Sequence, residues 1–179
     1  MLLNSSRELS NMKIFFIGFM GSGKSYWGKL LSEKLKVPFF DLDEKIVEDA
    51  GQSISEIFKM HGEEYFRVKE KDVLHLLTES HNTFIMACGG GTPCFYNNID
   101  YLKKSGTVIW LSTSTETIFN RLREEKEKRP LISEYSDNEL KSFIIKKYSS
   151  RKIYYRQANI VVNEEQVSLD SIMNSLFHP

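Results

Sequence analysis

Cysteine is scarce in this sequence. Only Cys88 and Cys94 occur among the 179 residues, and their spacing is not that of a paired C-x-x-C metal motif. Two cysteines are too few for a disulfide framework and suit a reducing compartment, so we expect the protein in the cytoplasm. Residues 1–11 lack the apolar centre of a signal peptide, and we expect a flexible leader there, with Met12 as an alternative start.

An excess of one charge and a long apolar run are also missing. Lys plus Arg and Asp plus Glu both number 24, so no overall field attracts nucleic acid or a membrane surface. No apolar run approaches the roughly 20 residues that span a bilayer. At 179 residues the chain is long enough for one well-buried core and short for two, so we expect a single domain over residues 1–179. The 41% hydrophobic and 27% charged residues are ordinary for a globular protein, and we expect it to act as a monomer. Because the positive and negative charges balance, any anion-binding site must come from a local group of residues and not from the overall charge.

A phosphate-binding loop is what the sequence does contain. Residues 18–25 read Gly-Phe-Met-Gly-Ser-Gly-Lys-Ser and fit G-x-x-x-x-G-K-[ST], between an apolar strand-like run at 14–17 and a helical run. The glycines let the backbone turn and aim N–H groups at an anion, beside the positive end of a helix dipole. Lys24 offers a charge to outer phosphates and Ser25 a hydroxyl to a hard cation. The loop thus predicts a nucleoside triphosphate with Mg²⁺, rather than a glycine-rich turn that binds nothing.

Two carboxylates, Asp41 and Asp43, follow the next short apolar run at 37–40. Ligands of open α/β sheets collect beyond the carboxyl ends of strands, so this pair is a candidate site. The alternative is that Asp41 caps the helix expected over 42–50, which is the commonest use of such an aspartate. We expect one of the two to be free for function.

Arg67 lies on a helix expected from Gly62 to about residue 80, after a short helix that opens with a capping box at 53–56. It is one helical turn from both Glu63 and Glu70. This spacing leaves two interpretations open. The pairs are surface salt bridges worth at most about 0.5 kcal/mol each, or a carboxylate holds the arginine so that it clamps an anion.

Three consecutive glycines, Gly89 to Gly91, follow a strand-like run at 83–88. They cost backbone entropy, and close approach of a ligand to the main chain is a sufficient reason for them. Farther along, residues 121–129 hold five basic and three acidic side chains, most of which indicate a solvated helix end. Arg129 differs because it precedes a proline, which disfavours helix, so we expect it on a loop that folds over a bound nucleotide.

Strands and helices alternate along the whole chain. Further strands are expected at 107–111 and 159–162, with helices at 26–36, 97–104, 114–125, 137–156 and 167–177. This order predicts an α/β protein in which a five-stranded parallel sheet lies between two helical layers. The phosphate-binding loop, the aspartate pair and the triple glycine then meet at the carboxyl edge of that sheet.

From Met12 onward the sequence resembles the shikimate kinase family, small P-loop kinases of the nucleoside monophosphate kinase type that act in aromatic amino acid biosynthesis. The matching motifs occur in the family's order. They are Phe39-x-Asp41-x-Asp43, Gly62-Glu63-x-x-Phe66-Arg67-x-x-Glu70, Gly89-Gly90-Gly91, Arg129-Pro130-Leu131, and Arg151 followed four residues later by Tyr155.

The resemblance implies a role for each site residue on the ATP side. Lys24, Asp43 and Arg129 are the catalytic residues, and Arg129 is the lid arginine of a segment at about 123–137. Ser25 and Asp41 hold Mg²⁺. Arg121 lies against the adenine, with Arg123 as its rival because the alignment is loose there. The remaining ATP-binding residues are Gly21, Ser22, Gly23 and Tyr26.

On the acceptor side the resemblance implies a substrate-binding segment at about 43–80. Asp43 holds the acceptor hydroxyl and takes its proton. Arg67, oriented by Glu70, and Arg151 grip the carboxylate of shikimate together with the backbone of Gly89, Gly90 and Gly91, because the planar fork of arginine binds a carboxylate at two points.

Other functions compete with this one. A related kinase would act on gluconate or a nucleoside monophosphate, and two arginines flanking a triple glycine favour a carboxylate-bearing polyol over a nucleotide. A GTP-dependent switch would carry an [NT]-K-x-D or D-x-x-G motif, and neither is present. A non-catalytic nucleotide-binding module would be free to lose Lys24, Ser25, Asp43 or Arg129, and all four are in place.

Overall fold

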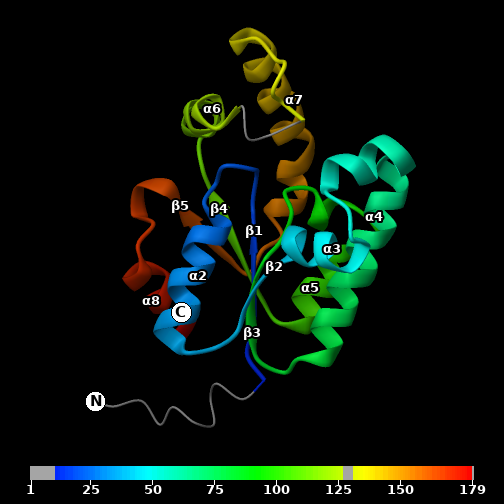
Figure 1. Cartoon of the computed structure of the whole chain (residues 1–179). Coiled ribbons are helices and arrows are strands. Elements are labelled where there is room, and N and C mark those ends of the chain that lie inside the picture. The colour runs from blue at the N-terminus through cyan, green and yellow to red at the C-terminus, as the bar shows by residue number, and fades with distance from the viewer. Residues whose placement is uncertain (1–10, 127–130, 179) are drawn as a thin grey trace.

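A five-stranded parallel sheet forms the centre of the protein (Figure 1). The computed structural model describes residues 11–126 and 131–178. The strand order is β2-β3-β1-β4-β5, with every neighbouring pair parallel. The strands are β1 (Lys13–Ile17), β2 (Phe39–Asp41), β3 (Phe84–Ala87), β4 (Thr107–Ser112) and β5 (Ile160–Asn163). The predicted α/β class and its five parallel strands are confirmed.

Helices cover both faces of this sheet. Figure 1 shows α2 and α8 on one side and α3, α4 and α5 on the other, while α6 and the start of α7 rise above the carboxyl edge. The helices are α2 (Lys24–Leu35), α3 (Leu42–Ala50), α4 (Ile54–Ser80), α5 (Asn98–Ser105), α6 (Thr115–Glu124), α7 (Asp137–Tyr155) and α8 (Leu169–Phe177). Short 3₁₀ helices follow β3 and β5 at Thr92–Cys94 (η1) and Glu164–Gln166 (η3).

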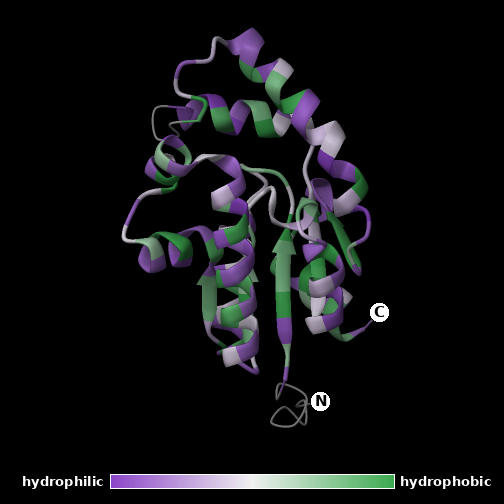
Figure 2. Cartoon of the chain, turned by 90° about the vertical axis from the view of Figure 1, so that its right-hand side faces the viewer, coloured by the Kyte–Doolittle hydropathy of each residue, from purple (hydrophilic) through white to green (hydrophobic). Residues whose placement is uncertain are grey.

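Side chains of β1 alternate between two hydrophobic cores. Ile14 and Phe16 pack in a cluster with Leu31 of α2 and Ile172 of α8, whereas Phe15 and Ile17 belong to the larger cluster on the opposite face. All four β1 side chains are inaccessible to solvent. Figure 2 accordingly shows hydrophobic strands between helices of mixed hydropathy. A parallel sheet buried on both faces explains why these strands appear in the sequence as unbroken apolar runs.

Strand register brings the expected site segments to one edge. Asp41 at the end of β2 pairs with Ala87 at the end of β3, and Phe16 of β1 also pairs with Ala87. The chain leaves β1 into the phosphate-binding loop and leaves β3 into the triple glycine. The three predicted segments therefore start side by side at the carboxyl edge.

A kink at Gly62 divides α4. We expected two helices here, and the structure has one element whose Gly62 adopts the non-helical angles φ 82° and ψ 175°. The capping box expected at its start is present, because Ser53 accepts from the Glu56 N–H and Glu56 accepts from the Ser53 N–H. The kink separates the first turns of α4 from the stretch that carries Arg67.

Gly62→Ala is expected to lower the free energy of unfolding by about 1–3 kcal/mol, because this region of backbone angles is nearly exclusive to glycine. A Cβ at this position meets no other atom within 4 Å, so the cost is conformational and not steric. Urea unfolding measures it.

Gly51→Ala is the matched control. Gly51 also has open space and positive φ, but its angles of 64° and 17° lie in the left-handed helical region, which Lys36 also occupies. We expect a smaller loss for this variant. An equal or larger loss for Gly51→Ala would show that the Gly62 backbone carries no special strain.

Candidate active site

The phosphate-binding loop has the backbone geometry that its glycines predict. Gly18, Gly21 and Gly23 all have positive φ, at 142°, 78° and 92°. Gly23 is the N-cap of α2, so that helix begins at Lys24 with its N-terminus beside the loop. The Lys24 ammonium is largely buried and donates to the carbonyl oxygens of Gly18 and Phe19 at 3.0 and 2.9 Å. The loop therefore encloses a positive charge at the carboxyl edge of the sheet.

Asp41 is the N-cap of α3, as one of the two alternatives predicted, and its second carboxylate oxygen contacts Ser25. Its Oδ1 accepts from the Asp43 backbone N–H at 3.1 Å, which caps α3. Its Oδ2 accepts from the Ser25 hydroxyl at 2.5 Å. A hydroxyl and a carboxylate in direct contact beside a phosphate-binding loop fit the oxygen ligands of Mg²⁺, which takes one or two protein oxygens and completes its shell with phosphates and water.

Asp43 lies close to Lys24 and Asp41 and also to Arg67 and Glu70, whose charges act on its carboxyl. The surrounding protein removes much of its hydration, and this raises the pKa of its carboxyl to about 6, with the charges of Asp41 and Glu70 adding to the rise. Lys24 and Arg67 oppose the shift. A carboxylate with this pKa is ionised at neutral pH and still basic enough to accept a proton.

Two cavities meet at Asp43. The first, of about 450 Å³, is lined by the phosphate-binding loop, the Ser25–Asp41 pair and Arg121. The second, of about 350 Å³, is lined by the arginines Arg67 and Arg151 and by apolar side chains. Both cavities share the residues Met20, Asp43, Gly89 and Gly90. A group bound in one cavity can thus reach a group bound in the other across Asp43.

Arg67 is buried, and its ion pair with Glu70 is not on the protein surface. Its Nη1 donates to Glu70 Oε2 at 2.8 Å, while Nε and Nη2 donate to Glu63 Oε1 at 3.3 and 3.1 Å. Glu70 is inaccessible to solvent. The guanidinium carbon also lies 4.4 Å from the ring centroid of Phe95. This settles the alternative in favour of an arginine held in a fixed orientation at a cavity wall.

The protein itself limits the space beside the triple glycine. A Cβ on Gly91 would lie 2.6 Å from Arg67 Nη2, and a Cβ on Gly89 would lie 2.8 Å from Glu70 Oε1. At Gly90 the nearest atoms are Met20 N at 3.3 Å and Arg151 Nη1 at 3.4 Å. At Gly89 and Gly91 the protein's own Arg67–Glu70 pair fills the space that a side chain would need, while the expected ligand contact with this main chain stays a prediction.

Arg151 reaches the second cavity from α7. Its guanidinium carbon lies 5.6 Å from the ring centroid of Phe19, and one turn later Tyr155 donates its hydroxyl to the carbonyl of Gly90 at 2.5 Å. Tyr155 is fully buried. The sequence marked Tyr155 only as part of a motif, whereas the structure shows that it ties α7 to the glycine segment.

Arg121 and Arg123 face different parts of the molecule. Arg121 Nη1 donates to the Gly21 carbonyl at 2.9 Å and lines the first cavity. Arg123 lies over the Phe119 ring, at 5.5 Å, in a separate cavity between α6 and α7. Tyr26, also expected near the nucleotide, is exposed and lines the first cavity. Arg129 lies outside the described residues, as do the other expected lid residues between 127 and 130.

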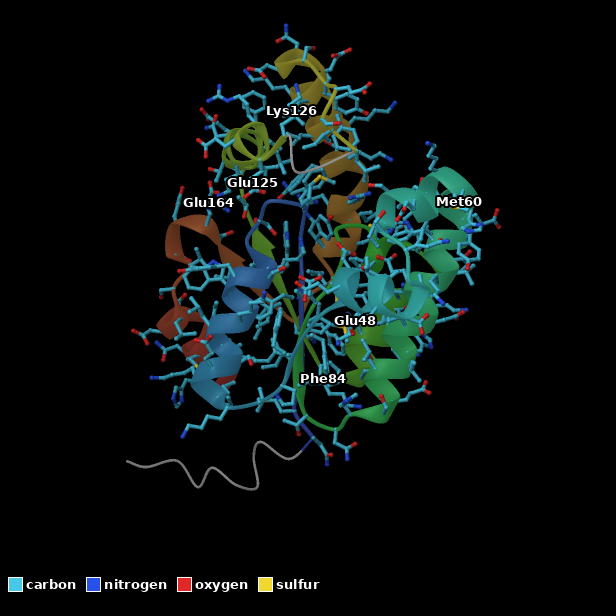
Figure 3. The ribbon with its side chains drawn as sticks, in the orientation of Figure 1. Glu48, Met60, Phe84, Glu125, Lys126 and Glu164 are labelled. Carbon is cyan, nitrogen blue, oxygen red and sulfur yellow. The ribbon has the colours of Figure 1, made fainter. Side chains whose placement is uncertain are left out.

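Sequence reasoning missed several cavity-lining residues. Trp27, Glu125 and Val167 line the first cavity, and Figure 3 shows Glu125 above the carboxyl edge, with Phe84 at the opposite end of β3. The second cavity adds Ile54, Ser55, Phe58, Phe66, Leu131 and Ile132. Apolar periodicity marks Trp27, Ile54 and Phe66 as core, and no sequence signal separates a core face from a cavity wall.

Comparisons with known proteins agree with this geometry. The family model described as shikimate kinase matches residues 20–178. A shikimate kinase from Bacteroides fragilis is 39% identical over 150 residues, which cover 84% of this chain and 83% of that protein. A crystal structure of the enzyme from Bacteroides thetaiotaomicron has a TM-score of 0.86 at 34% identity, covering 94% of this chain and 99% of that one. Shikimate kinase from Acinetobacter baumannii, solved in complex with shikimate, also has a TM-score of 0.86, at 29% identity and 96% coverage of both chains. Among the described residues, no helix is long and apolar enough to cross a membrane.

Asp43→Asn is expected to stabilise the fold at pH 7.5. The folded carboxyl has a pKa of about 6, above the ordinary 3.8, so it binds its proton more tightly in the folded state. The destabilising charge is fully present above about pH 6 and is absent below about pH 4. A shift of this size is worth about 3 kcal/mol for a fully buried group. Because Asp43 keeps an exposed surface on the cavities, water screens its charge and we expect about 1 kcal/mol.

Urea unfolding at pH 7.5, 5.5 and 4 measures the difference between Asp43→Asn and the unsubstituted protein. The gain should shrink as the pH falls. Asp72→Asn is the control, because Asp72 is an exposed aspartate of α4, and it should show no comparable gain. A loss of stability for Asp43→Asn at every pH would contradict the prediction.

Proposed function

The chain belongs to the shikimate kinase family, and from this premise we propose that it transfers the γ-phosphoryl group of ATP to the 3-hydroxyl of shikimate, giving shikimate 3-phosphate and ADP. This step serves aromatic amino acid biosynthesis. The observation that carries the proposal is the junction of two cavities at Asp43, one lined by a phosphate-binding loop and the other by two arginines. Phosphoryl transfer asks a protein mainly for positioning and charge neutralisation, and this arrangement suits both.

ATP would occupy the first cavity. Gly21, Ser22 and Gly23 would offer backbone N–H groups to its phosphates, and the Lys24 ammonium would exchange its carbonyl partners for phosphate oxygens. Tyr26 and Arg121 line the same cavity and would border the nucleoside. Ser25 and Asp41 would hold Mg²⁺, which neutralises charge on the β- and γ-phosphates when bound.

Shikimate would occupy the second cavity. Arg67 and Arg151 would bind its carboxylate with the backbone of Gly89, Gly90 and Gly91, and Asp43 would accept the proton of the hydroxyl that attacks. The apolar wall, which includes Phe58 and Phe66, suits the carbon ring. Support for Asp43 as the base comes from its place at the junction and from its raised pKa.

The lid is the remaining part of the proposal. Arg129 would close on the phosphates from a segment at about 123–137 and keep water from the γ-phosphate. Leu131 and Ile132 follow directly and line the second cavity, which supports a lid that touches both ligands. We further propose that the chain acts as a single domain, as a monomer, in the cytoplasm.

An assay of ADP release over shikimate, gluconate, AMP and CMP tests the function. We expect turnover with shikimate, dependent on Mg²⁺, and little with the other three. AMP and CMP carry no carboxylate for the two arginines, and gluconate is an open chain without the carbon ring that the apolar wall suits. A preference for any acceptor other than shikimate would overturn the proposal. ATP consumption without any phosphorylated acceptor would favour a nucleotide-dependent binding module instead.

Asp43→Asn is expected to lower kcat by about a thousandfold, the scale of a lost general base, while ATP still binds. The fluorescence of Trp27, which lines the first cavity, reports ATP binding independently of turnover. In the unsubstituted enzyme kcat/KM should fall as the pH drops through about 6, because the carboxyl takes up a proton there. A variant with the unsubstituted rate would remove Asp43 from the mechanism.

A further inference from the structure

A chain of buried hydrogen bonds lies behind Arg67. Glu70 accepts from Arg67 Nη1 through Oε2 at 2.8 Å and from the Thr92 hydroxyl through Oε1 at 2.7 Å. Both Glu70 and Thr92 are completely buried. The two oxygens of this carboxylate are therefore held from opposite sides, one by the arginine of the second cavity and one by a neutral hydroxyl.

Thr92 is itself fixed in place. It opens η1 directly after the triple glycine, and its backbone N–H donates to the Gly89 carbonyl at 3.1 Å. Its own carbonyl accepts from Asn98 Nδ2 at 2.9 Å, and Asn98 is also completely buried. Because the main chain of Thr92 is held at both ends, its hydroxyl has a defined position from which to donate to Glu70.

Glu70 is the firmer of the two anchors of Arg67. The other carboxylate, Glu63, is half exposed and receives longer bonds of 3.1 and 3.3 Å through a single oxygen. Together the two carboxylates use three of the five N–H groups of the guanidinium. One N–H on Nη1 and one on Nη2 remain for a ligand in the second cavity. Their direction depends on where Glu70 holds the fork.

We propose that Thr92 is a positioning residue for the acceptor. Its hydroxyl fixes the Glu70 carboxylate, and Glu70 in turn fixes the fork of Arg67 at the angle that binds the carboxylate of the acceptor. Within the described residues, Glu70 Oε1 has no other hydrogen-bond donor, so removal of the hydroxyl leaves a buried carboxylate oxygen unpaired and free to turn. This inference rests on the proposed function, in which Arg67 binds shikimate.

Thr92→Val tests the inference, because valine keeps the shape and removes the hydroxyl. We expect the KM for shikimate to rise about tenfold, equivalent to about 1.4 kcal/mol, while kcat and the KM for ATP change by less than about twofold. Thr92→Ser restores the hydroxyl and should return the KM for shikimate to near the unsubstituted value. A merely structural role would not separate the two KM values.

Thr78→Val is the matched control. Thr78 is another buried threonine, at the far end of α4, and its hydroxyl bonds the Leu74 carbonyl at 2.7 Å, away from both cavities. Thr78→Val should lower the stability of the protein about as much as Thr92→Val does, without any change in the KM for shikimate. If Thr92→Val does not fold, Thr92→Ala removes the hydroxyl without adding a methyl group and is measured in the same way.

The possible results distinguish a failure of this inference from a failure of the proposed function. An unsubstituted enzyme that does not phosphorylate shikimate contradicts the proposed function, and the inference falls with it. An active enzyme whose Thr92→Val variant keeps the KM for shikimate overturns the inference alone. An equal rise in the KM for shikimate and the KM for ATP also overturns it. The same holds if Thr92→Ser does not restore the KM for shikimate.

Discussion

The burial of the Glu70 carboxylate is the constraint on which the acceptor side of this site depends. A carboxylate without access to water is tolerated only when charge and hydrogen bonds replace its hydration. Arg67 supplies the charge and Thr92 the second hydrogen bond. Because this cluster packs directly against the main chain after β3, the chain needs glycine at Gly89 and Gly91. One buried charge thus explains an arginine, a threonine and two glycines from separate segments.

The same cluster also influences Asp43. Burial contributes most to the rise of its pKa to about 6, the charges of Asp41 and Glu70 add to it, and Lys24 and Arg67 oppose it. The sheet makes this possible, since parallel strands bring the ends of β1, β2 and β3 to one edge. The residues proposed to bind the acceptor, to act as the base and to bind phosphate therefore lie close together at a single place in the fold.

Much of this could be predicted from the sequence, and the failures have physical reasons. The strands lie within two residues of their predicted bounds, because two-faced burial gives unbroken apolar runs. The geometry of the phosphate-binding loop was predictable because its glycines occupy backbone angles with positive φ that favour glycine. Arg121 and Arg123 could not be told apart, because positions two apart on a helix point in different directions and only the packing of α6 decides which faces the loop. The packing of Arg67 and Glu70 against Gly91 and Gly89 was not predicted, because these residues are remote from the triple glycine in the chain.

Gly91 has a consequence for how the acceptor specificity of such an enzyme can evolve. The guanidinium of Arg67 occupies the space of its missing side chain, so no other residue fits at this position while the arginine keeps its place. Loss of the arginine alone would in turn leave Glu70 buried without its cation. A change of acceptor class by this route needs several simultaneous replacements in two distant segments. On the proposed role of Arg67, a single replacement at either position is expected to cost stability or acceptor binding before a second one compensates for it.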